Sequence, residues 1–207
     1  MPLRINTKNF RQFASVLGGS GAAMTRASYR TLNKVADKWK TRSRREITSR
    51  VRLTPSYVRE RMAVQHATPS SLTAIIKARV RGTRLATYGA KQLTRAAKTA
   101  KGDAIRAIPA GKKQAGVSVG VKRDRGRSKM RGAFMVPLKR GKEVAGSNGM
   151  GVFLRIGKGR KDIKHLYGPS VDQAFRWVID DTIGAVRADM RETFEKQSAY
   201  EFRRIIK

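Results

Sequence analysis

The stretch Gly21–Ile47, GAAMTRASYRTLNKVADKWKTRSRREI, decides how this chain begins to fold. Apolar side chains recur in it every three or four residues, while the remaining positions are mostly Lys, Arg or Asn; the clearest members are Leu32, Val35, Ala36 and Trp39. This spacing matches the 3.6 residues of a helical turn and places the apolar side chains on one face. The sequence therefore predicts a long amphipathic helix from Ala23 to Ile47, about seven turns, preceded by an N-terminal arm at residues 1–20.

A shorter helix is predicted immediately downstream. Thr54 and Pro55 read as an N-cap followed by proline at the first helical position, so we expect a helix over Ser56–Val64. Residues 38–64 together also have about the lengths of a DNA-reading helix-turn-helix, whose second helix would offer Ser56, Tyr57, Arg59 and Arg61 to a groove. The turn lacks glycine and the first helix is long and uniformly basic, so this alternative is disfavoured.

After Pro69 the hydrophobic period changes from about 3.6 to 2, which is typical of half-buried strands. Ala74, Ile76, Ala78 and Val80 are expected to share a face. The further expected strands are Val117–Lys122, Ala133–Leu138 and Val152–Ile156. The state of Leu85–Ala107 stays open, and the basic, glycine-containing stretches Lys122–Gly132 and Leu138–Gly151 are interpreted as long hairpin loops.

A second long helix closes the chain. Pro169 opens it, and apolar residues keep the 3.6 period from Val171 to Phe194, about six turns. Two helices, about four strands and one helix favour an α+β fold with an antiparallel sheet and long basic loops. We expect a single domain over residues 1–207, in which residues 82–115 are an insertion or a flexible segment.

The charge is the most unusual feature of the composition. The 207 residues carry 47 Lys and Arg against 14 Asp and Glu, a net charge of +33, and residues 1–171 hold 40 of the basic and only 7 of the acidic ones. A field of this size favours contact with polyanions or with acidic protein surfaces, and charge alone does not choose between them. There is no apolar run of the ~20 residues that span a bilayer, so we expect synthesis in a cytoplasm and no membrane partner.

Catalytic groups are scarce. Cysteine is absent, and the two histidines, His66 and His165, lie 99 positions apart without a neighbouring carboxylate at a motif spacing. Half of the acids lie on the last helix, where Asp180, Asp181, Asp189, Glu192 and Glu195 are interpreted as a solvated or partner-facing surface. Neither Gly18–Gly21 nor Gly157–Gly159 is followed by the Lys-Ser/Thr of a P-loop. We therefore expect no enzyme, no metal and no cofactor.

One basic loop is a candidate for phosphate contact. Every second position carries a cation, so the side chains could fan out along a phosphate backbone: Arg123, Arg125, Arg127, Lys129 and Arg131. The loop holds no aromatic residue, which disfavours base stacking. A solvated loop without a partner is the equal alternative.

Three groups of segments stand out, in order along the chain: the basic helix at 21–47 running into LTPSYVRERM, the block RLATYGAKQ followed by AGVSVGVKR, and RGAFMVPL followed by GVFLRIGKGRKDIKHLYGPSVDQAF. In this order they resemble the phage minor tail protein Z, or tail-completion, family. The likeness covers roughly residues 20–180. Two features depart from it: Asp162 stands where the family usually has proline, and Thr94–Lys113 matches poorly.

The resemblance implies a structural subunit of the virion, at the phage tail or neck, with no catalytic residues. It implies a homo-oligomeric ring, six-fold or twelve-fold, that joins the tail terminator or tail tube to the head-tail connector around the packaged DNA. The charge-balanced last helix could then pack on a neighbour's basic surface, and the expected subunit-interface residues are Trp39, Asp180, Asp181, Asp189 and Glu192. The alternative is a free, basic nucleic-acid-binding protein.

Overall fold

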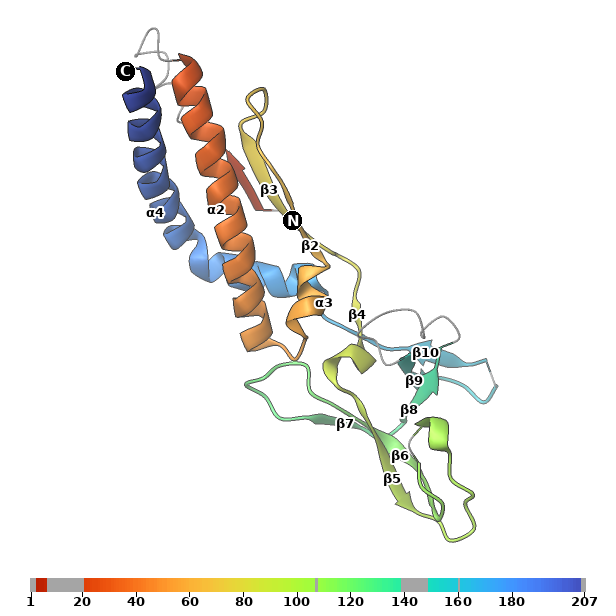
Figure 1. Cartoon of the computed structure of the whole chain (residues 1–207). Helices are drawn as coiled ribbons and strands as arrows, with labels where there is room; N and C mark the ends of the chain where they lie inside the picture. The colour runs from red at the N-terminus through yellow and green to blue at the C-terminus, as the bar shows by residue number, and fades with distance from the viewer. Residues whose placement is uncertain (1–2, 7–20, 107, 139–148, 160, 206–207) are drawn as a thin grey trace. The chain divides into compact units, whose positions relative to one another are not determined.

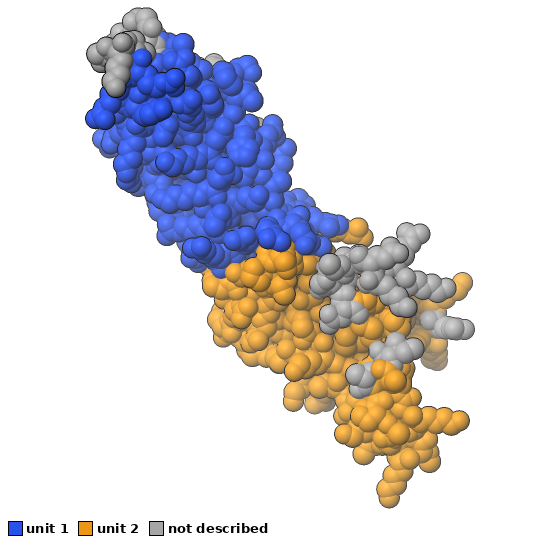
Figure 2. Space-filling model, viewed as in Figure 1, with its two compact units in different colours: residues 1–47, 58–80, 171–207 blue, residues 48–57, 81–170 orange. Residues whose placement is uncertain are grey.

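The computed structural model describes residues 3–6, 21–106, 108–138, 149–159 and 161–205. The chain divides into two compact units, each formed by separated stretches (Figure 2): unit 1 comprises residues 1–47, 58–80 and 171–207, and unit 2 comprises residues 48–57 and 81–170. The expectation of one domain over 1–207 stays a prediction. Most of the N-terminal arm and of the expected loop at 138–151 lies outside the described residues.

The elements confirm the α+β class. The helices are α2 (Gly21–Arg50), α3 (Pro55–Arg59) and α4 (Val171–Ile205), with short 3-10 turns η1 (Leu85–Tyr88) and η2 (Ala104–Arg106). The strands are β1 (Leu3–Asn6), β2 (Met62–Gln65), β3 (Thr73–Ala78), β4 (Thr83–Arg84), β5 (Lys91–Ala96), β6 (Lys112–Val119), β7 (Ser128–Met130), β8 (Ala133–Pro137), β9 (Met150–Arg155), β10 (Ile163–His165) and β11 (Tyr167–Gly168).

In unit 1 the two long helices lie side by side and antiparallel (Figure 1). The predicted apolar stripe of α2 is buried, with Leu32, Val35 and Trp39 at most 1% exposed. The indole Nε1 of Trp39 donates a hydrogen bond to Asp189 of α4, 2.9 Å away. Nearer the start of α2, Arg26 contacts Glu201, close to the end of α4. The order of these contacts fixes the antiparallel pairing, and the long helix predicted from Ala23 to Ile47 is confirmed.

Helix α4 changes direction within its first half (Figure 1). The hydroxyl of Thr182 donates to the Val178 carbonyl oxygen at 2.7 Å, a contact that competes with the helical hydrogen bonds. Gly184 follows two residues later and has no Cβ to stiffen the turn. Both features are recognised causes of helix bending.

The sheet of unit 1 has the order β1-β3-β2, with all pairs antiparallel. Asn33 of α2 ties this sheet to the helix, because its side chain accepts from the Ala67 amide at 2.7 Å and donates to the Ala67 carbonyl at 3.0 Å. The prediction of a helix over Ser56–Val64 is wrong in its second half. Helix α3 ends at Arg59, and Met62–Gln65 pairs with β3 instead, since burial of Met62 on that ladder outweighs the short local helix signal.

The same finding removes the helix-turn-helix alternative for residues 38–64. A recognition helix needs two or more turns to reach base edges in the major groove. Helix α3 has five residues and is followed directly by a strand, while α2 continues to Arg50.

Unit 2 holds three further small antiparallel sheets among its described residues, with the orders β5-β6-β7, β10-β9-β8 and β11-β4. The predicted strands at 117–122, 133–138 and 152–156 are present as β6, β8 and β9; β8 and β9 pair with each other, whereas β6 lies in another sheet. The side chain of Gln92 joins two of these sheets. Its Nε2 donates to the Gly116 carbonyl oxygen at 2.7 Å, and its Oε1 accepts from the backbone N–H of Met135 at 3.0 Å.

Two details of the strand prediction are corrected, and the stretch left open is assigned. Val80 and Ile156 are not on buried faces, because they lie just beyond the ends of β3 and β9 and are 70% and 67% exposed. The expected loop at 122–132 contains β7, which pairs with residues 117–119. Within the stretch left open above, residues 85–106 form η1, β5 and η2. The interpretation of residues 82–115 as an insertion or a flexible segment stays a prediction.

Candidate functional site: interlocked motifs, a basic surface and a charged helix

Two of the motifs quoted above meet in unit 2. Strand β4 of the RLATYGAKQ block pairs with β11 of the LYGPSV segment, although 83 positions separate them. Tyr88 is fully buried there, and its hydroxyl donates to the Pro169 carbonyl oxygen at 2.7 Å. A Cβ added at Gly168 would lie 2.8 Å from the Tyr88 ring, so only glycine fits. Burial raises the pKa of Tyr88 to about 12. The two motifs therefore form one interlocked structural cluster.

The Gly-Lys-Gly-Arg turn is closed by the residue that departs from the family pattern. The Asp162 carboxylate accepts from the Gly159 amide at 2.8 Å, and the Asp162 amide donates to the Gly159 carbonyl at 3.2 Å. A Cβ added at Gly157 would lie 2.5 Å from Asp162. The departure therefore changes the local turn chemistry, because proline could make neither contact.

An aromatic row crosses the β8-β9-β10 sheet and includes one histidine. The ring of His165 stacks on Phe153 at a centroid distance of 4.5 Å, and the ring of Tyr167 lies at the same distance from His165, tilted by 45°. Burial and the nearby Arg84 lower the pKa of His165. His66 instead lies within 3.1 Å of Asp37 in unit 1. Each histidine thus has a packing or hydrogen-bond contact within its own unit, His66 in unit 1 and His165 in unit 2.

Two of the five cations of the predicted phosphate-binding loop already donate hydrogen bonds to backbone carbonyl oxygens. The guanidinium of Arg127 donates to the Ser118 carbonyl at 2.7 Å and to the Gly89 carbonyl at 2.6 Å. Arg123 donates to the Thr48 carbonyl at 2.7 Å. Both arginines hold unit 2 together. Arg125, Lys129 and Arg131 are exposed.

The expected subunit-interface residues also separate into two groups. Trp39 and Asp189 contact each other inside unit 1, and Trp39 is 1% exposed. Lys38 adds an ion pair to Asp189 at 2.8 Å. The other three are exposed on α4: Asp180, Asp181 and Glu192. Glu192 bonds with Lys196 one turn on, which lowers the pKa of Glu192. Their role at a subunit interface stays a prediction.

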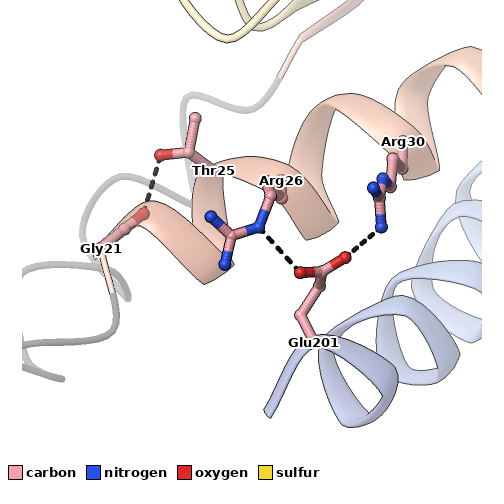
Figure 3. A network of polar contacts seen from close by, with 5 residues as sticks. All are labelled: Gly21, Thr25, Arg26, Arg30 and Glu201. Atoms are coloured by element: carbon pink, nitrogen blue, oxygen red, sulfur yellow. Dashed lines mark hydrogen bonds and ion pairs between the residues drawn. The ribbon is translucent and has the colours of Figure 1, made fainter. Parts of the chain in front are cut away.

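Sequence reasoning missed a carboxylate that holds the two long helices together (Figure 3). Glu201 is 1% exposed, accepts from Arg26 Nε at 2.8 Å and forms a second ion pair with Arg30. The hydrogen bond from Arg26 is the main reason that the pKa of Glu201 is lowered. A signal was present, because position 201 continues the inward-facing spacing of Met190 and Phe194 and faces a basic helix.

The positive charge is concentrated in unit 2. By sequence, unit 2 holds 25 of the 47 basic residues and 4 of the 14 acidic ones, a net charge of +21. Among the described residues, no group of three or more His, Cys, Asp or Glu side chains could hold a metal ion. No helix in the described ranges is long and apolar enough to cross a membrane. What the surface offers is charge and hydrogen-bond donors.

Comparison with known families gives one match and two negative results. The family described as prophage minor tail protein Z (GPZ) matches residues 16–207. No curated protein and no solved structure matches the chain. The match includes both stretches of the interlocked cluster at Tyr88 and Gly168, as well as both long helices. The chain belongs to the prophage minor tail protein Z family and is a structural component of a phage tail.

Proposed function

We propose that this protein is a tail-completion subunit, which assembles with copies of itself into a ring and joins the tail to the head connector around the DNA channel. The observation that carries the proposal is the family match over residues 16–207, nearly the whole chain. Only residues 1–15 lie outside this match. The neighbours proposed above and below the ring are the tail terminator or tail tube and the head-tail connector.

The charges supply a physical reason for subunits to associate head to tail. On α4, Trp177, Asp180, Asp181 and Gly184 follow the i, i+3, i+4, i+7 spacing of one helical face, and all four are exposed. Aromatic side chains are enriched at protein interfaces, and polar groups surround them at the rim, where the two carboxylates could contact a basic partner. A neighbouring copy offers a complementary surface in unit 2, with its net charge of +21. Contact between unlike surfaces of identical subunits closes into a ring when the rotation permits.

Electron microscopy of particles made without this protein tests the proposal. We expect tails that are incomplete at the head-proximal end or fail to stay attached to heads. Complete, head-attached and infectious particles in its absence would sink the proposal of a joining role.

A charge-reversal variant tests the proposed interface. In Asp180→Lys/Asp181→Lys the acidic face becomes basic, and we expect failure to rescue the deletion and loss of oligomers by light scattering. The matched control is Glu60→Lys/Glu195→Lys, which adds the same charge at two other exposed carboxylates. Equal rescue by both variants would contradict the assignment of this face.

A further inference from the structure

The β5-β6 hairpin continues beyond the three-stranded part of its sheet. Strand β7 pairs only with residues 117–119 of β6, whereas β5 pairs with β6 as far as Ala96 and Lys112. The hairpin then closes through hydrogen bonds from the Ala97 amide to the Gly111 carbonyl and from the Gly111 amide to the Ala100 carbonyl, each 2.8 Å. We call residues 94–106 and 108–114 the ribbon end.

The ribbon end is strongly basic. Five of its cations are exposed: Arg95, Lys98, Lys101, Lys112 and Lys113. Its one acidic residue, Asp103, is already paired with Arg106 at 3.2 Å. Within the described ranges, these five side chains make no ion pair or hydrogen bond. The charge of the ribbon end is therefore not neutralised within the described part of the chain.

The strand register makes this charge costly for the isolated protein. Arg95 and Lys113 are direct cross-strand partners. Side chains directly opposite on an antiparallel pair have Cβ atoms about 4.5–5.5 Å apart, and like charges there are destabilising. Elsewhere the same chain pairs its cations, as in Arg176–Asp172 and Arg191–Glu195 on α4. An anion lying over the ribbon would offset the repulsion.

The shape and composition of the ribbon end select the kind of anion. The major groove of B-form DNA, about 12 Å wide, admits a two-stranded ribbon, whereas the major groove of A-form RNA is too deep and narrow for side chains to read. Residues 94–114 contain no aromatic side chain that could stack on unpaired bases. Four of the five exposed cations are lysines, which act as point charges toward phosphate without bidentate base recognition.

We propose that the ribbon end binds the phosphate backbone of duplex DNA without sequence specificity. The sequence predicted phosphate contact for the loop at 123–131, whereas this proposal assigns it to the ribbon end. The reason is that Arg123 and Arg127 of the loop already donate to carbonyl oxygens of unit 2. This binding does not require a ring. It is measured on the isolated chain, so it can fail while the tail role stands.

The experiment compares two triple variants of the full chain. Lys98→Gln/Lys101→Gln/Lys113→Gln removes three charges from the ribbon end, and Lys34→Gln/Lys77→Gln/Arg187→Gln removes three exposed charges from unit 1. Fluorescence anisotropy with a labelled 30-base-pair duplex gives the slope of log affinity against log salt. We expect the ribbon variant to flatten this slope by about 2.7, since each lost phosphate contact on B-DNA contributes about 0.9. We expect the unit 1 variant to change it by less than about 1.

Three results would overturn the proposal. The first is an equal change in both variants, which would mean that only the total charge matters. The second is a flattened slope for Arg125→Gln/Lys129→Gln/Arg131→Gln with an unchanged slope for the ribbon variant, which would place the contact on the loop. The third is loss of polyglutamate binding in the ribbon variant while duplex binding is kept, which would make the partner an acidic protein.

A measurement without DNA guards against misfolding as an explanation. Removing Lys113 relieves the repulsion from Arg95, so Lys113→Gln alone should leave the urea midpoint equal to or slightly above that of the wild type. A lowered midpoint would contradict the argument from cross-strand repulsion.

Discussion

Glu201→Gln is the sharpest test of how the two long helices are held together. The substitution keeps the shape of the side chain and one oxygen acceptor but removes the negative charge that Arg26 and Arg30 share. Hydrogen bonds to charged groups contribute about 1.5–3 kcal/mol each. The arginines are 40% and 37% exposed, so water can replace part of what they lose. We therefore expect a loss of about 2–3 kcal/mol in the free energy of unfolding, below the sum of two full contributions.

The pH dependence gives this prediction a second, independent reading. The Arg26 hydrogen bond holds the pKa of Glu201 below its ordinary value of 4.5 in the folded protein. A carboxylate with a lowered folded-state pKa stabilises the protein above its unfolded-state pKa, and that stabilisation disappears as the pH falls through the folded-state value. The difference in the free energy of unfolding between wild type and Glu201→Gln should therefore be largest at pH 7. It should become smaller as the pH falls into the acid range.

Urea unfolding followed by circular dichroism and tryptophan fluorescence measures both quantities between pH 3 and 7. Glu195→Gln is the control, since Glu195 also pairs with an arginine on α4 but is 65% exposed, and its substitution should cost less than about 0.5 kcal/mol. Equal effects of the two substitutions at pH 7 would refute the reasoning. So would a Glu201→Gln effect that is the same at pH 3 and pH 7.

Three further substitutions test the interlocked motif cluster and the helix contact. Tyr88→Phe should cost about 1 kcal/mol through the lost bond to Pro169. It should also abolish the tyrosine titration seen in ultraviolet absorbance near pH 12. Because that pKa is raised, its stabilisation is present below pH 10 and lost as the pH rises toward 12, so the variant should lose less stability in alkali. Gly168→Ala should cost about 1–3 kcal/mol in urea unfolding by overpacking against Tyr88. The control Gly184→Ala, in open space on α4, should stabilise by about 0.5–1 kcal/mol, and the same sign for both would contradict the packing argument. Trp39→Phe should cost about 1–2 kcal/mol by removing the bond to Asp189, and no change in the urea midpoint would exclude that contribution.

The two long helices could be predicted from the sequence because their signal is local and long. The stripe at Leu32, Val35 and Trp39 repeats over many turns, and α4 keeps the same period from Val171. The strands themselves were also visible, but not their partners. The pairing of β4 with β11 joins residues 83 positions apart, and no alternation within either strand encodes it.

The candidate site was harder to predict because side chains of one type serve different purposes. The alternation of cations at 123–131 was visible, but the carbonyls of Ser118 and Thr48 that bind Arg127 and Arg123 come from other elements. The carboxylate of Glu201 lies on a buried stripe that sequence reasoning followed only as far as Phe194. The charge at 95–113 was overlooked, because the significance of Arg95 and Lys113 lies in a register that only pairing reveals.

Unit 1 is built from segments that lie far apart in the sequence, and this has a consequence for synthesis on the ribosome. Helix α2 is complete at Arg50, but Glu201, which binds Arg26 and Arg30, is made 151 residues later. At roughly 5–20 residues per second this interval lasts roughly 8–30 s. During that time the apolar stripe of α2 lacks its α4 partner and must be shielded by other parts of the nascent chain or by chaperones. Truncated chains that lack α4 should accordingly be far more prone to aggregation than the full protein.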